Sequence, residues 1–247
     1  MVVEYDGTCY HGFQYQDKVP TIQGELEKAV SKLTKEIVKI KGAGRTDTGV
    51  HAKGQVVVFD TQSTFSTNKI TEGLNHYLPE DIAIQSAFRT VDDFDPRRDA
   101  HSRRYRYTII NQQTRAPLSR RMAHRVSGLL CVEAMSEAAK VMEGVHDFEA
   151  FGGSSCKEAA STVRRVYLAT VWKEKQGDEV YFEIEANAFL TYQVRRMMGA
   201  LVDVGLGRLT ENDIGRMLER RSNKVVANTL PPQGLCLMEV TYDKFPS

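Results

Sequence analysis

The 247-residue sequence predicts an α+β fold made of two halves, because strand-like and helix-like segments follow one another in the same order twice. Apolar residues at helical spacing indicate the helices, and short alternating apolar runs indicate the strands. Hydrophobic residues make up 41% of the chain, enough to bury a sizeable core. No low-complexity linker separates the halves, so we expect residues 1–100 and 101–247 to form a rigid pair.

The first half contains four predicted strands and two predicted helices. Strands are expected at residues 2–5, 37–40, 55–59 and 82–88, and helices at about 22–33 and 67–77. Thr21 and Thr67 stand where helix N-caps belong, and Pro79 ends the second helix. The resulting order, β-α-β-β-α-β, is that of the ferredoxin-like unit.

The second half repeats this order with insertions. Strands are expected at residues 105–110, 163–173, 180–186 and 235–242, helices at about 132–142, 190–204 and 211–218, and a loop at 146–153. The halves share no visible sequence identity, so the repeat is a topological prediction. Two such ferredoxin-like halves would leave a cleft between their sheets, lined by loops and by the basic connection described below.

The composition makes several classes of protein and site improbable. No apolar run is long enough to span a bilayer, and the first residues lack the pattern of a signal peptide, so we expect a soluble, cytoplasmic protein. The cysteines form no C-x-x-C pair and have no histidine at ligand spacing; they are Cys9, Cys131, Cys156 and Cys236. We therefore expect neither a metal site nor a disulfide framework.

Positive charge is concentrated in one segment. The whole chain has a formal net charge of +1, but residues 95–125 carry +7 and the remainder −6. The segment combines Asp95 and Asp99 with nine arginines: 97, 98, 103, 104, 106, 115, 120, 121 and 125. A solvated basic face would explain a charge run, but the interleaved Tyr105 and Tyr107 and the absence of lysine favour contact with nucleic acid.

The residues from Gly44 to Ala52 form the strongest candidate for an active-site loop. Asp47 lies beside Arg45 and between two glycines, in a short connection between strand-like segments. A free aspartate titrates near about 3.9 and a neighbouring guanidinium lowers that value, so Asp47 would be ionised at neutral pH. It could act as a nucleophile or an acceptor, or only cap amides in a hairpin turn. His51 could line the same site.

A second candidate segment is the amphipathic stretch from Asn187 to Gly199, which carries Arg195 and Arg196. Consecutive helical side chains point about 100° apart, so the two arginines cannot serve one face. An inward arginine would need a carboxylate, for which Asp47 is a candidate; a surface arginine pair is the alternative. Phosphate-binding G-x-x-x-x-G-K-[ST], hydrolase G-x-S-x-G and metalloprotease H-E-x-x-H motifs do not occur.

These segments together closely resemble the tRNA pseudouridine synthase A family, and the resemblance runs almost end to end. The G-R-T-D-x-G-V-H block at 44–51 is highly specific, whereas the Y-D-G and G-L-x-L pieces are weak alone. The matching blocks, in order, are Tyr5-Asp6-Gly7, Gly12-Phe13-Gln14, Gly44 to Ala52, Arg104-Tyr105-Arg106-Tyr107, His146 to Phe151, Phe189-Leu190 with Val194-Arg195, Gly199, and Gly234 to Leu237.

The resemblance implies an isomerase of the pseudouridine synthase fold that needs no cofactor. It would convert uridine to pseudouridine in the anticodon arm of tRNA, at positions 38–40 of the tRNA, and act as a homodimer. Asp47 would be the essential carboxylate, Tyr105 would stack on the uracil, and Arg195 would pair with Asp47. Arg45 would enter the RNA stack where the target base leaves. Further substrate contacts are expected from His51, Arg103 and Arg104.

Three places depart from the family pattern: Asp95-Pro96-Arg97-Arg98, Thr191-Tyr192-Gln193 and Pro232. They affect the expected packing and tRNA contacts, not the catalytic set. A noncatalytic ferredoxin-like RNA-binding protein remains the alternative hypothesis, and an RNA chaperone activity alongside catalysis is a third.

Overall fold

The computed structural model describes residues 1–153, 161–219 and 228–243. The chain divides into two compact units, Met1–His101 together with the chain from Cys236 onward, and Ser102–Leu235. The sequence prediction assigned the last strand to the second half. The structure groups it with the first unit, where Cys236 and Leu237 pair with His51 and Ala52 in parallel.

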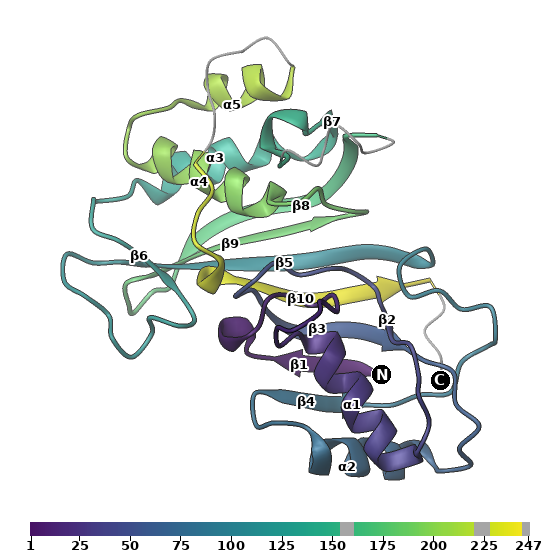
Figure 1. The fold of residues 1–247 in the computed structure, drawn as a ribbon. Helices are drawn as coiled ribbons and strands as arrows, with labels where there is room; N and C mark the ends of the chain where they lie inside the picture. Colours follow the sequence, from purple (N-terminus) through teal and green to yellow (C-terminus); the bar gives the residue numbers. More distant parts are fainter. Residues whose placement is uncertain (154–160, 220–227, 244–247) are drawn as a thin grey trace. The chain divides into compact units, whose positions relative to one another are not determined.

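Unit 1 has the β-α-β-β-α-β order that the sequence predicted (Figure 1). Its elements are β1 (Val2–Tyr5), α1 (Ile22–Thr34), β2 (Lys41–Gly42), β3 (His51–Val58), α2 (Thr67–Tyr77), β4 (Ile82–Ser86) and β10 (Leu235–Tyr242). The strand order is β4-β1-β3-β10, with β2 also paired to β3, and β1 runs antiparallel to both of its neighbours. The two helices pack against each other, and α2 also contacts β4.

Local sequence signals explain most of these elements. The Thr21 side chain caps α1 by accepting a hydrogen bond from the amide of Gly24, at 3.2 Å, as predicted. The cap of α2 is Ser66, one residue before the predicted Thr67.

The predicted strand at residues 37–40 is wrong. Its backbone pairs with no strand, and the amide of Ile40 bonds instead to the Glu27 carboxylate of α1 at 3.0 Å. Strand pairing begins only at β2, and β3 starts at His51 and not at residue 55.

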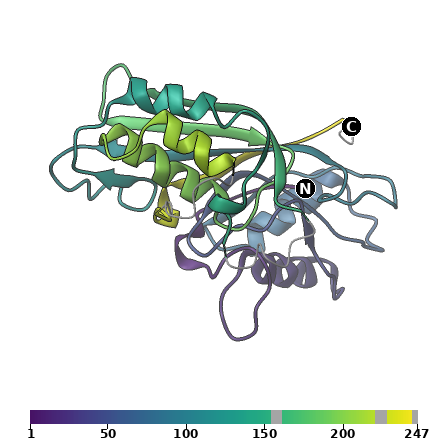
Figure 2. The same cartoon turned by 90° about the horizontal axis from the view of Figure 1, so that it is seen from above.

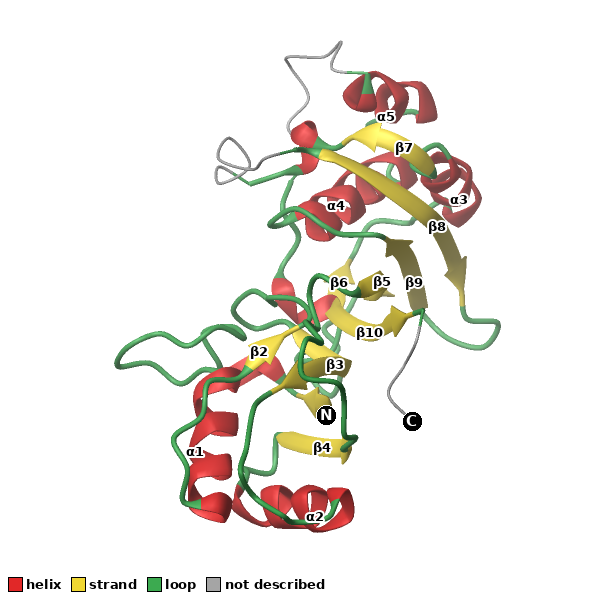
Figure 3. Ribbon diagram, turned by 90° about the vertical axis from the view of Figure 1, so that its right-hand side faces the viewer, coloured by secondary structure: helices red, strands yellow, loops and turns green. Residues whose placement is uncertain are grey.

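Unit 2 is a sheet covered by helices. Its elements are β5 (Ala100–Asn111), β6 (His124–Val126), α3 (Val132–Lys140), β7 (Gly144–Asp147), β8 (Val163–Lys173), β9 (Glu179–Ala186), α4 (Gln193–Gly205) and α5 (Glu211–Leu218). The strand order is β5-β9-β8-β7, with β6 parallel to the end of β5. Figures 2 and 3 show α3 and α4 side by side on one face of this sheet.

Two short strands of unit 2 were not predicted. β7 occupies the start of the expected loop at 146–153, and β6 was not expected at all. Neither strand has a buried face, so neither leaves the alternating pattern from which strands are recognised. The prediction of an α+β fold is confirmed, with apolar helix faces such as Leu26 and Val30 at no more than 1% exposure.

Candidate active site

The Asp47 loop, residues 43–50, connects β2 to β3 within unit 1 (Figure 1). The two strands pair antiparallel, Lys41 with Val58 and Gly42 with Val57, so the loop closes a hairpin. The sequence predicted a connection between two strands here, with residues 37–40 as the first of them. Arg45 is exposed and Asp47 is partly exposed, while Thr46 between them is buried at 6% exposure. The loop therefore turns one side chain into the unit and presents its neighbours at the surface.

Buried hydrogen bonds hold this loop in place. The Tyr5 hydroxyl lies 2.8 Å from Thr46 Oγ1, and burial raises the pKa of this tyrosine far above its ordinary value. Gln55 Nε2 donates to the Gly44 carbonyl at 2.9 Å, and the amide of Phe13 donates to the Thr46 carbonyl at 3.0 Å. These contacts fix the backbone directly before Asp47.

A glycine-containing segment, residues 6–13, lies directly against the Asp47 loop. Gly12 has φ +89°, and a Cβ added there would stand 2.7 Å from the Thr46 carbonyl oxygen. Gly7 also packs too closely against the loop for a larger residue, because a Cβ there would collide with the Val50 carbonyl oxygen. The amide of Gly49 donates to the Tyr10 carbonyl at 3.3 Å. The Y-D-G and G-F-Q pieces are thus the support of the loop.

His51 begins β3 and is almost completely buried, at 2% exposure. Its Nδ1 accepts a hydrogen bond from the amide of Gly7 at 3.1 Å, and Asp6 Oδ1 lies at the same distance from Nδ1. Its Nε2 has no hydrogen-bond partner among the described residues. The structure gives His51 a place in the support of the loop, and a contact with substrate stays a prediction.

In unit 2, β5 places Arg103, Tyr105 and Tyr107 on one face of the sheet, because side chains alternate along a strand. The Tyr105 ring meets Phe189 edge to face, with 5.3 Å between ring centroids. The Tyr107 hydroxyl donates to the Pro231 carbonyl at 2.7 Å, and burial raises the pKa of Tyr107. Arg103, at 8% exposure, donates to the backbone carbonyl at residue 187 at 2.8 Å.

Arg104 and Arg106 lie on the opposite face of β5. Arg106 donates to the Glu183 carboxylate from both Nε, at 3.0 Å, and a terminal nitrogen, at 2.8 Å. Arg104 lies 3.8 Å from the same carboxylate. The substrate contacts predicted for Arg103 and Arg104 therefore cannot both be made from one face of the sheet.

Arg195 and Arg196 are both half-buried in the first turn of α4. Arg195 Nε donates to the Leu230 carbonyl at 2.7 Å, and its guanidinium carbon lies 5.1 Å from the centroid of the Tyr192 ring. Arg196 Nε donates to Thr229 Oγ1 at 3.0 Å. The two side chains take different partners, as their angular separation predicted, and the pairing of Arg195 with Asp47 stays a prediction.

The departure at Thr191-Tyr192-Gln193 has a clear local role. Tyr192, with φ +64°, is the N-cap residue of α4, and Gln193 is fully buried behind it. Gln193 Oε1 accepts a hydrogen bond from the amide of Leu190 at 2.8 Å, which closes the turn that leads into the helix. These residues fix the start of the helix that carries Arg195.

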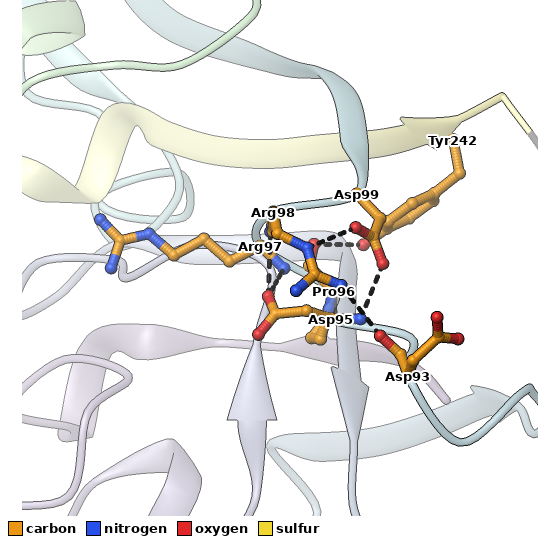
Figure 4. Close-up of polar contacts among 7 residues, drawn as sticks. All are labelled: Asp93, Asp95, Pro96, Arg97, Arg98, Asp99 and Tyr242. Carbon is orange, nitrogen blue, oxygen red and sulfur yellow. Dashed lines mark hydrogen bonds and ion pairs between the residues drawn. The ribbon is translucent and has the colours of Figure 1, made fainter.

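The departure at residues 95–98 forms a turn bonded to itself (Figure 4). Asp95 Oδ1 accepts hydrogen bonds from the amides of Arg97 and Arg98, each at 2.9 Å. Arg98 Nε donates to Asp99 Oδ1 at 2.9 Å. The amide of Arg98 is the main reason that the pKa of Asp95 is lowered, and the Arg98 side chain does the same for Asp99. Figure 4 shows the Arg97 side chain extending away from this network.

The sequence singled out the candidate catalytic and binding side chains but not the residues that support them. Tyr5, Thr46, Phe189 and Tyr192 were given no role of their own, although the first three belong to blocks that match the family and Tyr192 belongs to a departure from its pattern. Within the described ranges, no group of three His, Cys, Asp or Glu residues could hold a metal ion. No helix in those ranges is long and apolar enough to cross a membrane.

Comparisons with known proteins agree with the family resemblance of the sequence blocks. A family model described as tRNA pseudouridine synthase matches residues 1–97 and 138–243. The tRNA pseudouridine synthase A of Citrifermentans bemidjiense is 40% identical over 247 residues, covering 99% of this chain and 97% of that protein. The protein of the same name from Geotalea daltonii is 42% identical over 242 residues, covering 98% of each chain. That of Myxococcus xanthus is 43% identical over 243 residues, covering 98% of this chain and 91% of its own.

Among solved structures, an archaeal box H/ACA sRNP Nop10-Cbf5 complex aligns with a TM-score of 0.34 and 11% identity, over 83% of this chain and 44% of that one. That likeness is too weak to support a conclusion. The family model and the near-full-length relatives are sufficient, and the chain belongs to the tRNA pseudouridine synthase family.

Proposed function

We propose that this protein converts uridine to pseudouridine in the anticodon arm of tRNA, with Asp47 as the catalytic carboxylate. The observation that carries the proposal is the Asp47 loop. A partly exposed carboxylate stands on a hairpin that is held by buried hydrogen bonds and closely packed glycines. Preorganisation of this kind is what a catalytic group requires, whereas a plain surface turn needs no such support.

The proposed reaction rearranges bonds without changing the atoms of the nucleotide. The C1′–N1 bond breaks, the uracil turns, and C1′ joins C5; the proton on C5 is lost and N1 gains one. Asp47 either attacks C1′ as a nucleophile or acts as the base that initiates glycosidic cleavage. No electrons are gained or lost, so the reaction requires no redox cofactor and no energy source.

Tyr105 and Arg195 have the proposed supporting roles. Tyr105 stacks on the uracil and assists removal of the C5 proton, and Arg195 pairs with the Asp47 carboxylate. Their surroundings suit these roles: the edge-to-face contact with Phe189 orients the Tyr105 ring, and the Leu230 carbonyl and Tyr192 ring hold the guanidinium of Arg195. Arg45, exposed beside Asp47, is proposed to fill the space that the extruded base leaves.

The test uses an unmodified tRNA transcript in which uridines carry tritium at C5. Incubation with the protein should release tritium, and chemical mapping should place the new pseudouridines in the anticodon arm at positions 38–40. A matched transcript with cytidines at those positions should release none. Binding without release would support the noncatalytic alternative, and release from both transcripts would refute the anticodon-arm assignment.

We also propose that the enzyme is a cytoplasmic homodimer, as the family resemblance implies. Sedimentation velocity at micromolar concentration should give a mass near twice that of the chain, 27.8 kDa. A single species at the monomer mass would refute the dimer without affecting the proposed reaction.

A further inference from the structure

Two groups among the arginines of the basic segment differ in their partners, and Arg97 and Arg103 belong to neither. In the first group a carboxylate neutralises the guanidinium: Arg98 bonds to Asp99, and Arg106 bonds to Glu183. Such pairs have little net charge to offer a polyanion, because the partner carboxylate would repel it. Counting arginines in the sequence therefore overstates the charge that is available for RNA.

The second group lies in residues 112–126, which we call the basic arm. The arm runs from the end of β5 through β6, and Figure 1 shows its first part as a long loop between these two strands. It contains no aspartate or glutamate, and four exposed arginines: 115, 120, 121 and 125. Among the described residues no ion pair joins any of the four to a carboxylate. The arm thus carries four positive charges that no ion pair within residues 1–153, 161–219 and 228–243 offsets.

Hydrogen bonds within the arm order its backbone. The amide of Met122 donates to the Ser119 carbonyl at 3.0 Å, and Arg120 donates to the Pro117 carbonyl at 2.7 Å. Arg125 donates to the carbonyl of Gln113 at 3.1 Å. A carbonyl partner orients a guanidinium without cancelling its charge, and an arm ordered in advance loses less entropy on binding.

The base of the arm is clamped to the sheet by one asparagine. Asn111, the last residue of β5, donates from Nδ2 to the carbonyls of Val126, at 3.0 Å, and Gly128, at 2.6 Å. Its Oδ1 accepts from the amide of Leu130 at 3.3 Å. The arm therefore starts and ends at fixed points.

We propose that the basic arm binds the phosphate backbone of the tRNA substrate, with Arg115 and Arg121 as direct contacts. Guanidinium groups suit phosphate because they donate paired hydrogen bonds and remain charged at any physiological pH. The side chains of Arg115 and Arg121 are exposed, and within the described residues neither guanidinium forms a hydrogen bond or an ion pair; the Gln112 side-chain amide bonds to Arg115 only at its backbone carbonyl. This inference rests on the proposed function for the identity of the RNA, but not on the roles of the catalytic residues.

The experiment compares the double variant R115Q/R121Q with the wild-type protein and with R208Q/R216Q. The control variant loses the same charge from unit 2, at arginines that are 67% and 64% exposed but paired with Asp203 and Asp213. Binding of unmodified tRNA is measured by filter retention from 0.05 to 0.4 M salt. Melting temperatures of all three proteins provide a check on folding.

We expect R115Q/R121Q to reduce the slope of log affinity against log salt by about 2, about 1 for each lost phosphate contact. If the lines converge near 1 M salt, binding at 0.15 M becomes about 40-fold weaker. The single-turnover rate of tritium release at saturating tRNA should stay within about twofold of wild type. R208Q/R216Q should leave both the slope and the rate unchanged.

The proposal is overturned if R115Q/R121Q keeps the wild-type slope, or if the control lowers the slope equally, since net charge alone would then explain the effect. The proposal would also be overturned if R115Q/R121Q changed the oligomeric state of the protein and left RNA binding unchanged, because the arm would then be an interface between protein subunits. Failure of the proposed function looks different: the wild-type protein would release no tritium, whatever the slopes are.

Discussion

Replacement of Gly12 by alanine tests whether the segment at residues 6–13 positions the Asp47 loop. Gly12 has φ +89°, a conformation in which an L side chain costs roughly 1–2 kcal/mol. The new Cβ would also stand 2.7 Å from the Thr46 carbonyl oxygen and 3.3 Å from the Asp47 carbonyl carbon. The Thr46 carbonyl would have to move by about 0.7 Å to restore an ordinary contact at 3.4 Å.

A displacement of this size should be visible in catalysis. Because a misplacement of about 1 Å at a reacting group can cost about 100-fold in rate, we expect G12A to lower the single-turnover rate between about 10- and 100-fold. The assay is tritium release at saturating tRNA, so weaker binding does not contribute. Thermal unfolding should show only the modest loss that the backbone strain predicts.

Gly207 provides the matched control. Its φ is +71°, so alanine there meets the same kind of backbone strain, but no atom lies within 4 Å of the added Cβ. G207A should therefore lose similar stability and keep the wild-type rate. If G12A keeps the wild-type rate, or if both variants lose rate equally, the contact between Gly12 and the Asp47 loop does not position the carboxylate.

Two further predictions concern hydrogen bonds. Y5F removes the hydroxyl that bonds to buried Thr46, so it should lower the free energy of unfolding by about 1–3 kcal/mol in urea titrations. The control Y15F changes a half-exposed ring and should stay within about 0.5 kcal/mol of wild type. Equal losses in the two variants would contradict the role of the buried hydrogen bond. The pKa of Asp95 is lowered below its ordinary value of 3.8 in the folded protein. The ionised side chain therefore stabilises the fold at pH values above 3.8, and this stabilisation is lost as the pH falls through the lowered pKa. D95N should therefore be less stable than wild type at pH 7, with the difference vanishing in acid; a difference that grows as pH falls would contradict this sign.

Strong periodic segments of this fold could be predicted from the sequence. The bounds of β8, α5 and β10 match the expected residues, because each has a regular pattern of buried side chains or a clear cap such as Thr210. A strand was wrongly predicted at residues 37–40 because Val38 and Ile40 are apolar and buried, as alternate residues of a strand are. Its backbone is satisfied by Glu27, a side chain from another element, which no local pattern reveals.

In the candidate site, too, the features with a local sequence pattern could be predicted and those that depend on contacts between distant segments could not. Asp47 could be singled out because its loop has an unusual composition. Of the hairpin around it, only the strand after the loop was predicted, since the strand before it is Lys41–Gly42 and not the apolar segment 37–40. The support from Tyr5 and Gly12 could not be predicted, because it depends on contacts with Thr46, which lies 41 residues after Tyr5 and 34 after Gly12. The neutralised state of Arg106 likewise depends on Glu183, 77 residues away.

The most direct test of the central claim is single-turnover tritium release by D47N. The amide keeps the size of the side chain but cannot act as a carboxylate nucleophile or base, so the rate should fall by about 10⁴-fold or more while tRNA binding persists. D60N, which removes an exposed carboxylate from the same unit, should match wild type. If D47N retains more than about a tenth of the wild-type rate, Asp47 is not the catalytic carboxylate.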